Sequence, residues 1–195
     1  SLPCKLILDD EFTNFNHRKW FWRTDGNADQ FLKPYGIRLS LPASKYSNSY
    51  NNSEFYNHNY PYLRAFAQIR LKNSNIEEGS RGWGFWNGEM DRSKSEMAWF
   101  IMIDGYENPK RNGFFAVTQG INEEVIKTSI KNISLDKWHT FSIDWRTNCV
   151  RFWIDNTMVA EHIQDIPASQ MRFDVWVDNA IYIKKKKFFQ NINKT

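Results

Sequence analysis

The stretch DKWHTFSIDWRTNCVRFWIDNTMVAEH, Asp136 to His162, decides the fold. Apolar and polar residues alternate in 139–145 (HTFSIDW) and again in 150–154 (VRFWI). Alternation with period two is typical of an antiparallel strand with one buried face. Asp155-Asn156-Thr157 follows, and these residues tolerate the positive φ that a tight hairpin turn requires. The stretch therefore predicts two amphipathic strands around a short polar turn, and then a tight hairpin.

Similar short strands are expected along most of the chain. The predicted ranges are 5–8, 20–23, 36–41, 62–71, 83–86, 96–103, 114–118, 125–130 and 173–177. Residues 42–60 are rich in Ser, Asn and Tyr and are expected to form a loop over one end of the fold. Residues 121–133 also fit helical spacing, but a strand is favoured there because a helix would interrupt a meander. Many short strands joined by turns predict an all-β sandwich.

Composition narrows the possible classes of function. The formal net charge is +4, and the run Lys184–Lys187 supplies all of it, because 22 basic and 22 acidic residues remain elsewhere. A nucleic-acid-binding protein needs a basic stripe rather than one local patch, so nucleic acid is not an expected partner. No apolar run is long enough for a membrane span, and the sequence leaves the localisation open. We expect one domain, 1–195, in which 184–195 is a basic C-terminal strand or tail.

Aromatic residues are unusually frequent, at 16% of the chain with nine Trp. A sandwich core uses many of them, and the excess of Trp suggests that some line a cleft. Flat aromatic faces there can stack on sugars or enclose an apolar ligand. The two cysteines, Cys4 and Cys149, fit either a disulfide or two free thiols.

Two groups of residues resemble a known family. Asp9-Asp10-Glu11-Phe12 followed by Trp20, and KWHTF…DW…VRFWIDN within 137–156, are similar to the family-sixteen glycoside hydrolases and their concanavalin-like relatives. The resemblance covers about residues 5–178. It implies a jelly roll of two curved antiparallel sheets, with a ligand cleft on the concave face.

Active members of that family carry Glu-x-Asp-x-Glu on one concave strand, as nucleophile, assisting residue and acid/base. The matching stretch here is 95–100 (SEMAWF), in which Glu96 takes the place of the nucleophile. Ala98 replaces the Asp and Phe100 replaces the last Glu, and neither can transfer a proton. An alternative register, GEMD at 88–91, keeps the first half of the motif but has Ser93 in place of the second Glu. The resemblance therefore comes with a degenerate catalytic motif.

Several residues remain candidates for the concave face. An acid/base role is open to Glu96, in an apolar and aromatic environment, together with Asp174, Asp104 or Glu54. The candidates for ligand binding are Trp83, Trp86, Trp99, Phe100, Trp176, Tyr62 and Arg64. His139 is expected to be a structural residue. With no His or Cys cluster at metal spacing, neither a catalytic metal nor a cofactor is expected, although the resemblance allows a structural calcium.

Three functions follow from these observations. A glycan-binding protein explains the fold, the excess Trp and the degenerate motif together, and it is the preferred hypothesis. The alternative is an enzyme with rewired acid/base chemistry that uses Glu96. It would act either on a polysaccharide as a retaining hydrolase or on an apolar small molecule as an isomerase, cyclase or hydratase. A third hypothesis is a structural or adhesive protein whose Lys184–Lys187 run contacts an acidic surface.

Overall fold

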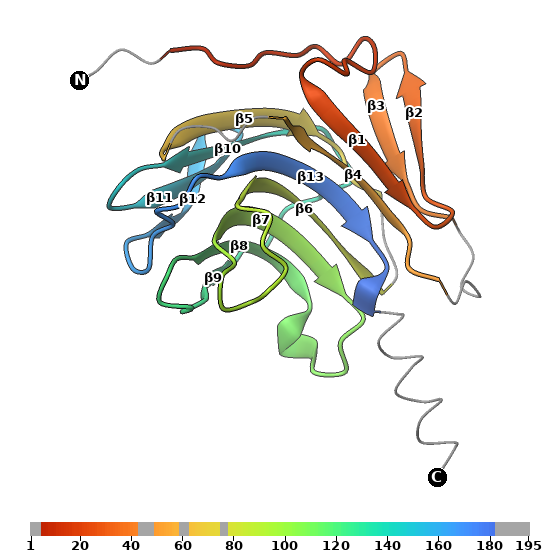
Figure 1. The fold of residues 1–195 in the computed structure, drawn as a ribbon. Coiled ribbons are helices and arrows are strands. Elements are labelled where there is room, and N and C mark those ends of the chain that lie inside the picture. Colours follow the sequence, from red (N-terminus) through yellow and green to blue (C-terminus); the bar gives the residue numbers. More distant parts are fainter. Residues whose placement is uncertain (1–4, 43–48, 59–62, 75–77, 182–195) are drawn as a thin grey trace.

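Antiparallel strands make up nearly all of the regular structure in the computed structural model (Figure 1). The structure describes residues 5–42, 49–58, 63–74 and 78–181. The elements are β1 (Trp20–Asp25), β2 (Asp29–Lys33), β3 (Gly36–Ser40), β4 (Asn52–Asn57), β5 (Ala65–Leu71), β6 (Gly79–Trp86), β7 (Met97–Asp104), η1 (Pro109–Arg111), β8 (Gly113–Gln119), β9 (Ile126–Ser129), β10 (His139–Trp145), β11 (Val150–Ile154), β12 (Thr157–His162) and β13 (Arg172–Asp178). The predicted all-β jelly-roll class is confirmed.

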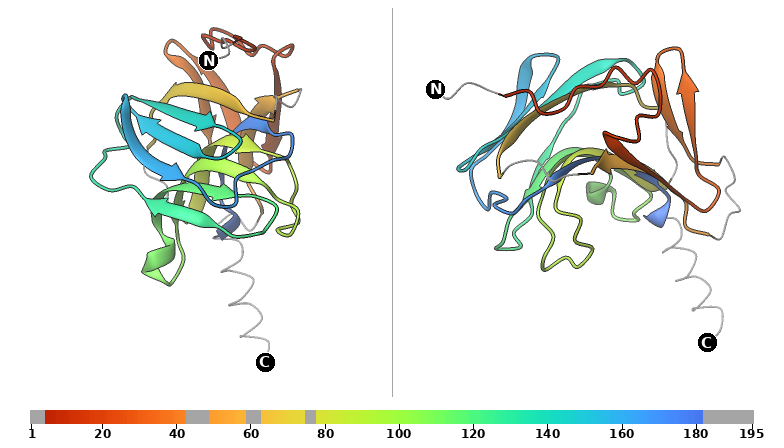
Figure 2. Two further views of the ribbon diagram at one scale, coloured as in Figure 1. Left: turned by 90° about the vertical axis from the view of Figure 1, so that its left-hand side faces the viewer. Right: turned by 45° about the horizontal axis from the view of Figure 1, so that its top comes forward.

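The strands form two stacked layers and a separate hairpin. One layer is a seven-stranded sheet in the order β1-β4-β13-β6-β7-β8-β9, and the other is a four-stranded sheet in the order β12-β11-β10-β5. Both sheets arch in the same direction, and the four-stranded sheet covers the convex side of the larger one (Figure 2). The hairpin β2–β3 stands at one end, beside β1 and β4 (Figure 1). No described helix has the length and apolar character needed to cross a membrane.

The main core lies between the two sheets. The four-stranded sheet contributes Phe141, Ile143, Trp145, Val150, Phe152 and Ile154, and the larger sheet contributes Trp83, Phe85, Ala98, Phe100, Phe114 and Ala116. Ring contacts tie the layers together, because Phe141 and Phe152 each lie 5.2 Å from Phe100 between ring centres. Burial of these aromatic side chains is the dominant stabilising term.

The strands predicted from 136–162 are confirmed, and so are the faces that they present. Phe141 pairs with Ile154 and Trp145 pairs with Val150, so both apolar faces point into the core. Asp155 and Asn156 form the turn between β11 and β12 with φ of 48° and 66°. The segment that also fitted helical spacing contains a strand, β9.

Other predictions were wrong. Residues 5–8 form no strand, and Leu6 and Ile7 are exposed. The range 42–60, predicted as a loop, contains the buried strand β4, and β2 was not predicted at all.

Cys149 is a buried free thiol. Cys4 and the predicted tail 184–195 lie outside the described residues.

The core assignment predicts unequal effects for two identical substitutions in the four-stranded sheet. Phe141→Ala removes a ring that contacts Trp83, Phe100 and Phe114, and should lower the free energy of unfolding by about 3–5 kcal/mol. Phe66→Ala removes a ring that is 56% exposed, and should change it by less than about 0.5 kcal/mol. Urea denaturation measures both. Equal losses would mean that the two faces of the sheet are assigned wrongly.

Candidate functional site

The seven-stranded sheet carries apolar clusters on both faces. One face packs into the main core. The opposite face, called here the open face, points away from the four-stranded sheet and forms the hollow side of the arch (Figure 2). The open face carries a second apolar cluster that contains no residue of the four-stranded sheet. Its members are Met97, Ile101, Phe115 and Val117, with Trp86, Trp99, Ile103 and Trp176 packed against them.

Strand β7 presents no carboxylate on the open face. Met97, Trp99 and Ile101 point there, whereas Ala98 and Phe100 lie fully buried in the core between the sheets. The expectation that 96, 98 and 100 share the concave face is therefore wrong. β7 is apolar on both faces, so its residue pattern could not tell the two faces apart.

Glu96 has a structural environment. It immediately precedes β7 and is 9% exposed, and its Oε1 accepts a hydrogen bond of 2.9 Å from the backbone N–H of Ala168. Its own N–H donates to Oδ1 of Asn87 at 3.1 Å. Glu96 thus joins the loop before β7 to the loop before β13, and it is separated by the sheet from the carboxyl groups of the open face.

A row of tryptophans crosses the centre of the open face. Trp99 lies 6.0 Å from Trp86 and 4.8 Å from Trp176 between ring centres. Trp86 Nε1 donates to Ser95 Oγ at 3.0 Å, and Trp176 Nε1 donates to Ser80 Oγ at 3.3 Å. All three rings are half-buried, so each keeps part of its surface accessible. The row comes from three adjacent strands: β6, β7 and β13.

Gly82 makes room for one end of this row. A Cβ atom at this position would lie 2.4 Å from Cη2 of Trp176, which is closer than real atoms approach. The absent side chain lets the Trp176 ring lie against the backbone of β6. The ring therefore presents a flat face instead of standing upright on the sheet.

Two of the candidate carboxylates come together beside the row. Glu54 on β4 and Asp174 on β13 lie on the open face of neighbouring strands, where Glu54 pairs with Trp176 and Asp174 with Tyr56. Asp174 has no exposed surface and Glu54 is 8% exposed. In the described part of the chain, no N–H or O–H group donates to either oxygen of Asp174, so the other carboxyl is its partner.

The environment of the pair favours the protonated form of Asp174. Burial raises the pKa of Asp174 well above its ordinary value. The Glu54 carboxylate raises this pKa further, by its charge and as a hydrogen-bond partner, while the positive charges of Arg172 and Arg23 act in the opposite direction. Two close carboxyl groups are compatible when one of them is protonated. Asp174 therefore keeps its proton to a higher pH than an ordinary aspartate does.

Two further acidic residues, Asp178 and the predicted candidate Asp104, are not members of this pair. Asp178 also faces the open side, where it accepts a hydrogen bond of 2.9 Å from Ser80 Oγ. Burial raises its pKa, and the hydrogen bonds from the backbone of Ala180 and from Ser80 oppose that shift. Asp104 ends β7 with its side chain on the core side of the alternation, and it lines a cavity there.

Two of the predicted ligand-binding residues are misplaced. Trp83 is 2% exposed and Phe100 is fully buried, and both belong to the main core rather than to the open face. Arg64 is exposed just before β5, where it donates to Thr147 Oγ1 at 3.4 Å, far from the Trp row in the fold. Tyr62 lies outside the described residues.

Arg172 is a site residue that the sequence did not reveal. Its guanidinium carbon lies 3.7 Å from the ring centre of Tyr56 and 5.7 Å from that of Trp86. It alternates with Asp174 and Trp176 on β13, so its place on this face could have been found from the same periodicity. Arg172 thus extends the Trp row towards the carboxyl pair and adds a positive charge to it.

His139 has a structural environment. His139 Nδ1 lies 2.6 Å from Asp155 Oδ2 and its Nε2 lies 2.7 Å from the carbonyl oxygen of Ser134, as predicted for a structural residue. The hydrogen bond with Asp155 raises the pKa of His139. Within the described ranges, no three His, Cys, Asp or Glu side chains are grouped to hold a metal ion.

Replacement of Asp174 should change how stability depends on pH. A carboxyl group whose pKa is raised by folding contributes stability when protonated, and that contribution is lost as pH rises through the folded pKa. Asp174→Asn keeps the shape and cannot ionise. When the pH is raised from about 4.5 to about 8.5, the free energy of unfolding of the variant should therefore increase relative to that of wild type.

Chemical denaturation at both pH values measures this difference. Asp136→Asn, at an exposed turn position, is the control and should follow wild type. A constant difference between Asp174→Asn and wild type at both pH values would show that Asp174 titrates as an ordinary carboxyl group.

Comparison with known proteins identifies the fold. No protein family's sequence model matches the chain, and no curated protein sequence does. Among solved structures, it is similar to the β-glucanase of Bacillus licheniformis, with a TM-score of 0.66 and 13% identity over 86% of this chain and 82% of that one. A β-1,3-1,4-glucanase (lichenase) from a mouse hindgut metagenome gives 0.61 and 10%, over 86% and 83%.

The laminarinase catalytic domain of Thermotoga maritima gives a TM-score of 0.59 with 12% identity, over 89% of this chain and 86% of that one. At these identities the similarity establishes the fold alone. The chain therefore has the concanavalin-like jelly-roll fold of the family-sixteen glycoside hydrolases, the family that its sequence resembles.

Proposed function

We propose that this protein binds glycans on the open face of the seven-stranded sheet. The observation that carries the proposal is the contiguous row Trp86–Trp99–Trp176, which the fold holds on three adjacent strands. Flat aromatic faces stack on the apolar faces of sugar rings, and neighbouring polar groups then orient the hydroxyls. Arg172, Glu54 and Asp178 supply such groups beside the row.

The structural neighbours suggest which glycans to test first. Their names describe a β-glucanase, a β-1,3-1,4-glucanase and a laminarinase. We therefore propose β-glucans as the first ligand class, bound along the Trp row of the open face. The apolar open face of β7 supports binding without hydrolysis. Retaining hydrolysis needs two carboxyl groups roughly 5–5.5 Å apart across the scissile bond, and Met97, Trp99 and Ile101 provide none.

One observation favours a second candidate, an enzyme with rewired acid/base chemistry. The Asp174–Glu54 pair places a carboxyl group whose pKa is raised beside a second carboxyl group, and general acid/base catalysis uses such arrangements. Glu96, on the other side of the sheet, would have no part in it. Asp174 has no exposed surface, so a substrate would touch it only after the side chains above it move. For that reason the binding function is preferred.

The binding proposal predicts that single tryptophans on the open face control affinity. Trp99→Ala and Trp176→Ala should each weaken binding to mixed-linkage β-glucan or laminarin by about tenfold or more, because buried aromatic contacts carry most of the energy of an interface. Affinity electrophoresis in gels containing the polysaccharide measures the change.

Phe66→Ala is the matched control, since it removes an exposed aromatic ring from the opposite side of the sandwich and should leave the mobility shift unchanged. Unfolding midpoints verify that every variant is folded. Unaltered binding by both Trp variants would refute the assignment to the open face.

Product analysis separates the two candidates. We expect no new oligosaccharides by mass spectrometry after incubation with β-glucans, galactans and xyloglucan. If products appeared, and were lost in Asp174→Asn and Glu54→Gln but not in Glu96→Gln, the protein would be an enzyme that uses the open-face pair. Loss in Glu96→Gln alone would instead restore the role that the sequence pattern gives this residue.

A further inference from the structure

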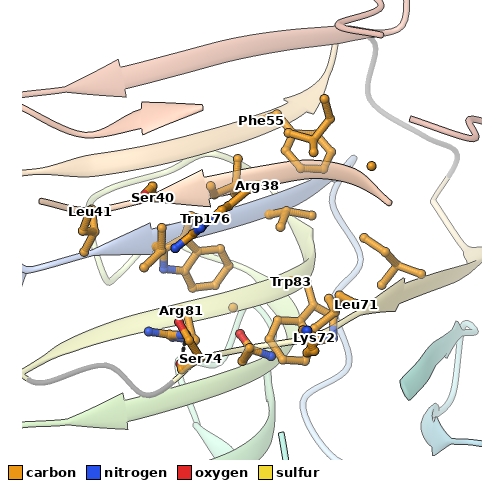
Figure 3. A pocket seen from close by; sticks show the side chains of 18 of the residues that line it. Arg38, Ser40, Leu41, Phe55, Leu71, Lys72, Ser74, Arg81, Trp83 and Trp176 are labelled. Atoms are coloured by element: carbon orange, nitrogen blue, oxygen red, sulfur yellow. Dashed lines mark hydrogen bonds between the residues drawn. The ribbon is translucent and has the colours of Figure 1, made fainter. Parts of the chain in front are cut away.

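A cavity lies on the opposite side of the same sheet from the Trp row. The cavity has a volume of about 1180 Å³ and sits where the four-stranded sheet stops at β5 and the hairpin β2–β3 begins (Figure 3). β3 pairs only with β2, and β5 pairs only with β10, so no strand bridges the two in the described part of the chain. The floor of the cavity is formed by β6 and β13.

Apolar and polar side chains both line the cavity. The apolar side chains come from the hairpin, from the end of β5 and from the core side of β4 and β13, and include Leu39, Leu41, Phe55, Ile69, Leu71 and Val175. A volume of this size is far larger than a packing defect and has room for a small organic ligand. The lining predicts a ligand whose body is largely apolar.

One buried positive charge faces this cavity without a counter-ion. Arg81 lines the floor and is 9% exposed. Its Nη1 donates to the carbonyl oxygen of Ser74 (Figure 3), but Nε has no partner, and no acidic side chain of the described residues pairs with the guanidinium. Burial lowers the pKa of Arg81 to about 10, so the side chain remains charged near neutrality. A buried unpaired cation is costly unless an anion accompanies it.

Other groups around the cavity favour an anion as well. Trp83 Nε1 and Asn73 Nδ2 are further buried donors without partners, and both residues line the cavity. Arg38, Arg70 and Lys72 add positive charge to the walls. The acidic residues of the lining are Glu78 and Asp104. Cations thus outnumber carboxylates there, and the unpartnered polar atoms are donors.

We propose that this cavity binds an amphipathic anion, an apolar chain with a carboxylate head, and that Arg81 binds the head. The guanidinium offers a planar fork of N–H donors that matches a carboxylate, and the apolar walls cover the chain. This site is distinct from the open face. Gly82 and Trp176 border both, whereas Trp99 belongs to the open face alone.

Isothermal titration calorimetry tests the proposal with two probes of equal chain length and opposite charge. Tetradecanoate and tetradecyltrimethylammonium are each titrated into the full chain below their critical micelle concentrations. Tetradecanoate should bind at one site, and the cation should bind at least about tenfold more weakly, a difference of about 1.4 kcal/mol.

Variants then locate the head group. Arg81→Met removes the charge at similar length and should weaken tetradecanoate binding at least about tenfold, while Arg81→Lys should recover part of the affinity. Arg151→Met removes an arginine that pairs with Glu161 on the other sheet and should bind like wild type. Trp99→Ala, which disturbs the open face, should also bind like wild type. Unfolding midpoints verify that each variant is folded.

Three results would contradict the proposal that Arg81 binds the head group of an anion in this cavity. Equal affinity for the two probes would show that the cavity does not select an anion. Unchanged binding by Arg81→Met, or loss of binding in Trp99→Ala, would place the head group elsewhere. If Arg81→Met does not fold, the comparison of the two probes on wild type and on Arg81→Lys still decides.

Discussion

The alternation of side chains along β6, β7 and β13 is the constraint on which the rest of the structure depends. Each strand sends every second residue to the core and the others to the open face, so a shift of one residue would exchange the two sets. On β6, Trp83 is thereby fixed in the core and Trp86 on the open face. The cross-strand pair of Phe100 with Trp83 fixes β7 against β6, and Trp99 then has no place but the open face.

Sequence periodicity predicted the fold well where one face of a strand is polar. β10 and β11 alternate clearly, and their faces, their register and the Asp155–Asn156 turn were all predictable. β4 was missed because Asn52 and Ser53 resemble turn residues. Both are buried, and their side chains bond to Asp25 and to the backbone of Asp29, partners that lie more than twenty residues away. Sequence patterns do not show such distant partners.

The candidate site was predictable in part, for the same reason. Trp86, Trp99, Trp176, Asp174 and Glu54 were all named from the sequence, and the fold places them on one face. The assignment of Glu96, Phe100 and Trp83 to that face was wrong. β7 is apolar on both faces, so its residue pattern does not tell which face packs into the core. The cavity at Arg81 follows from the gap between β3 and β5, and this gap is a property of the topology alone.

A strand that is apolar on both faces also restricts how the molecule can change. A carboxylate introduced on the core side of β7, at 98 or 100, would lose its hydration among the core rings. Such a substitution would destabilise the protein, because a lone buried acid lacks a partner group. A functional carboxylate on this strand would therefore have to occupy the open face, where position 99 keeps part of its surface accessible.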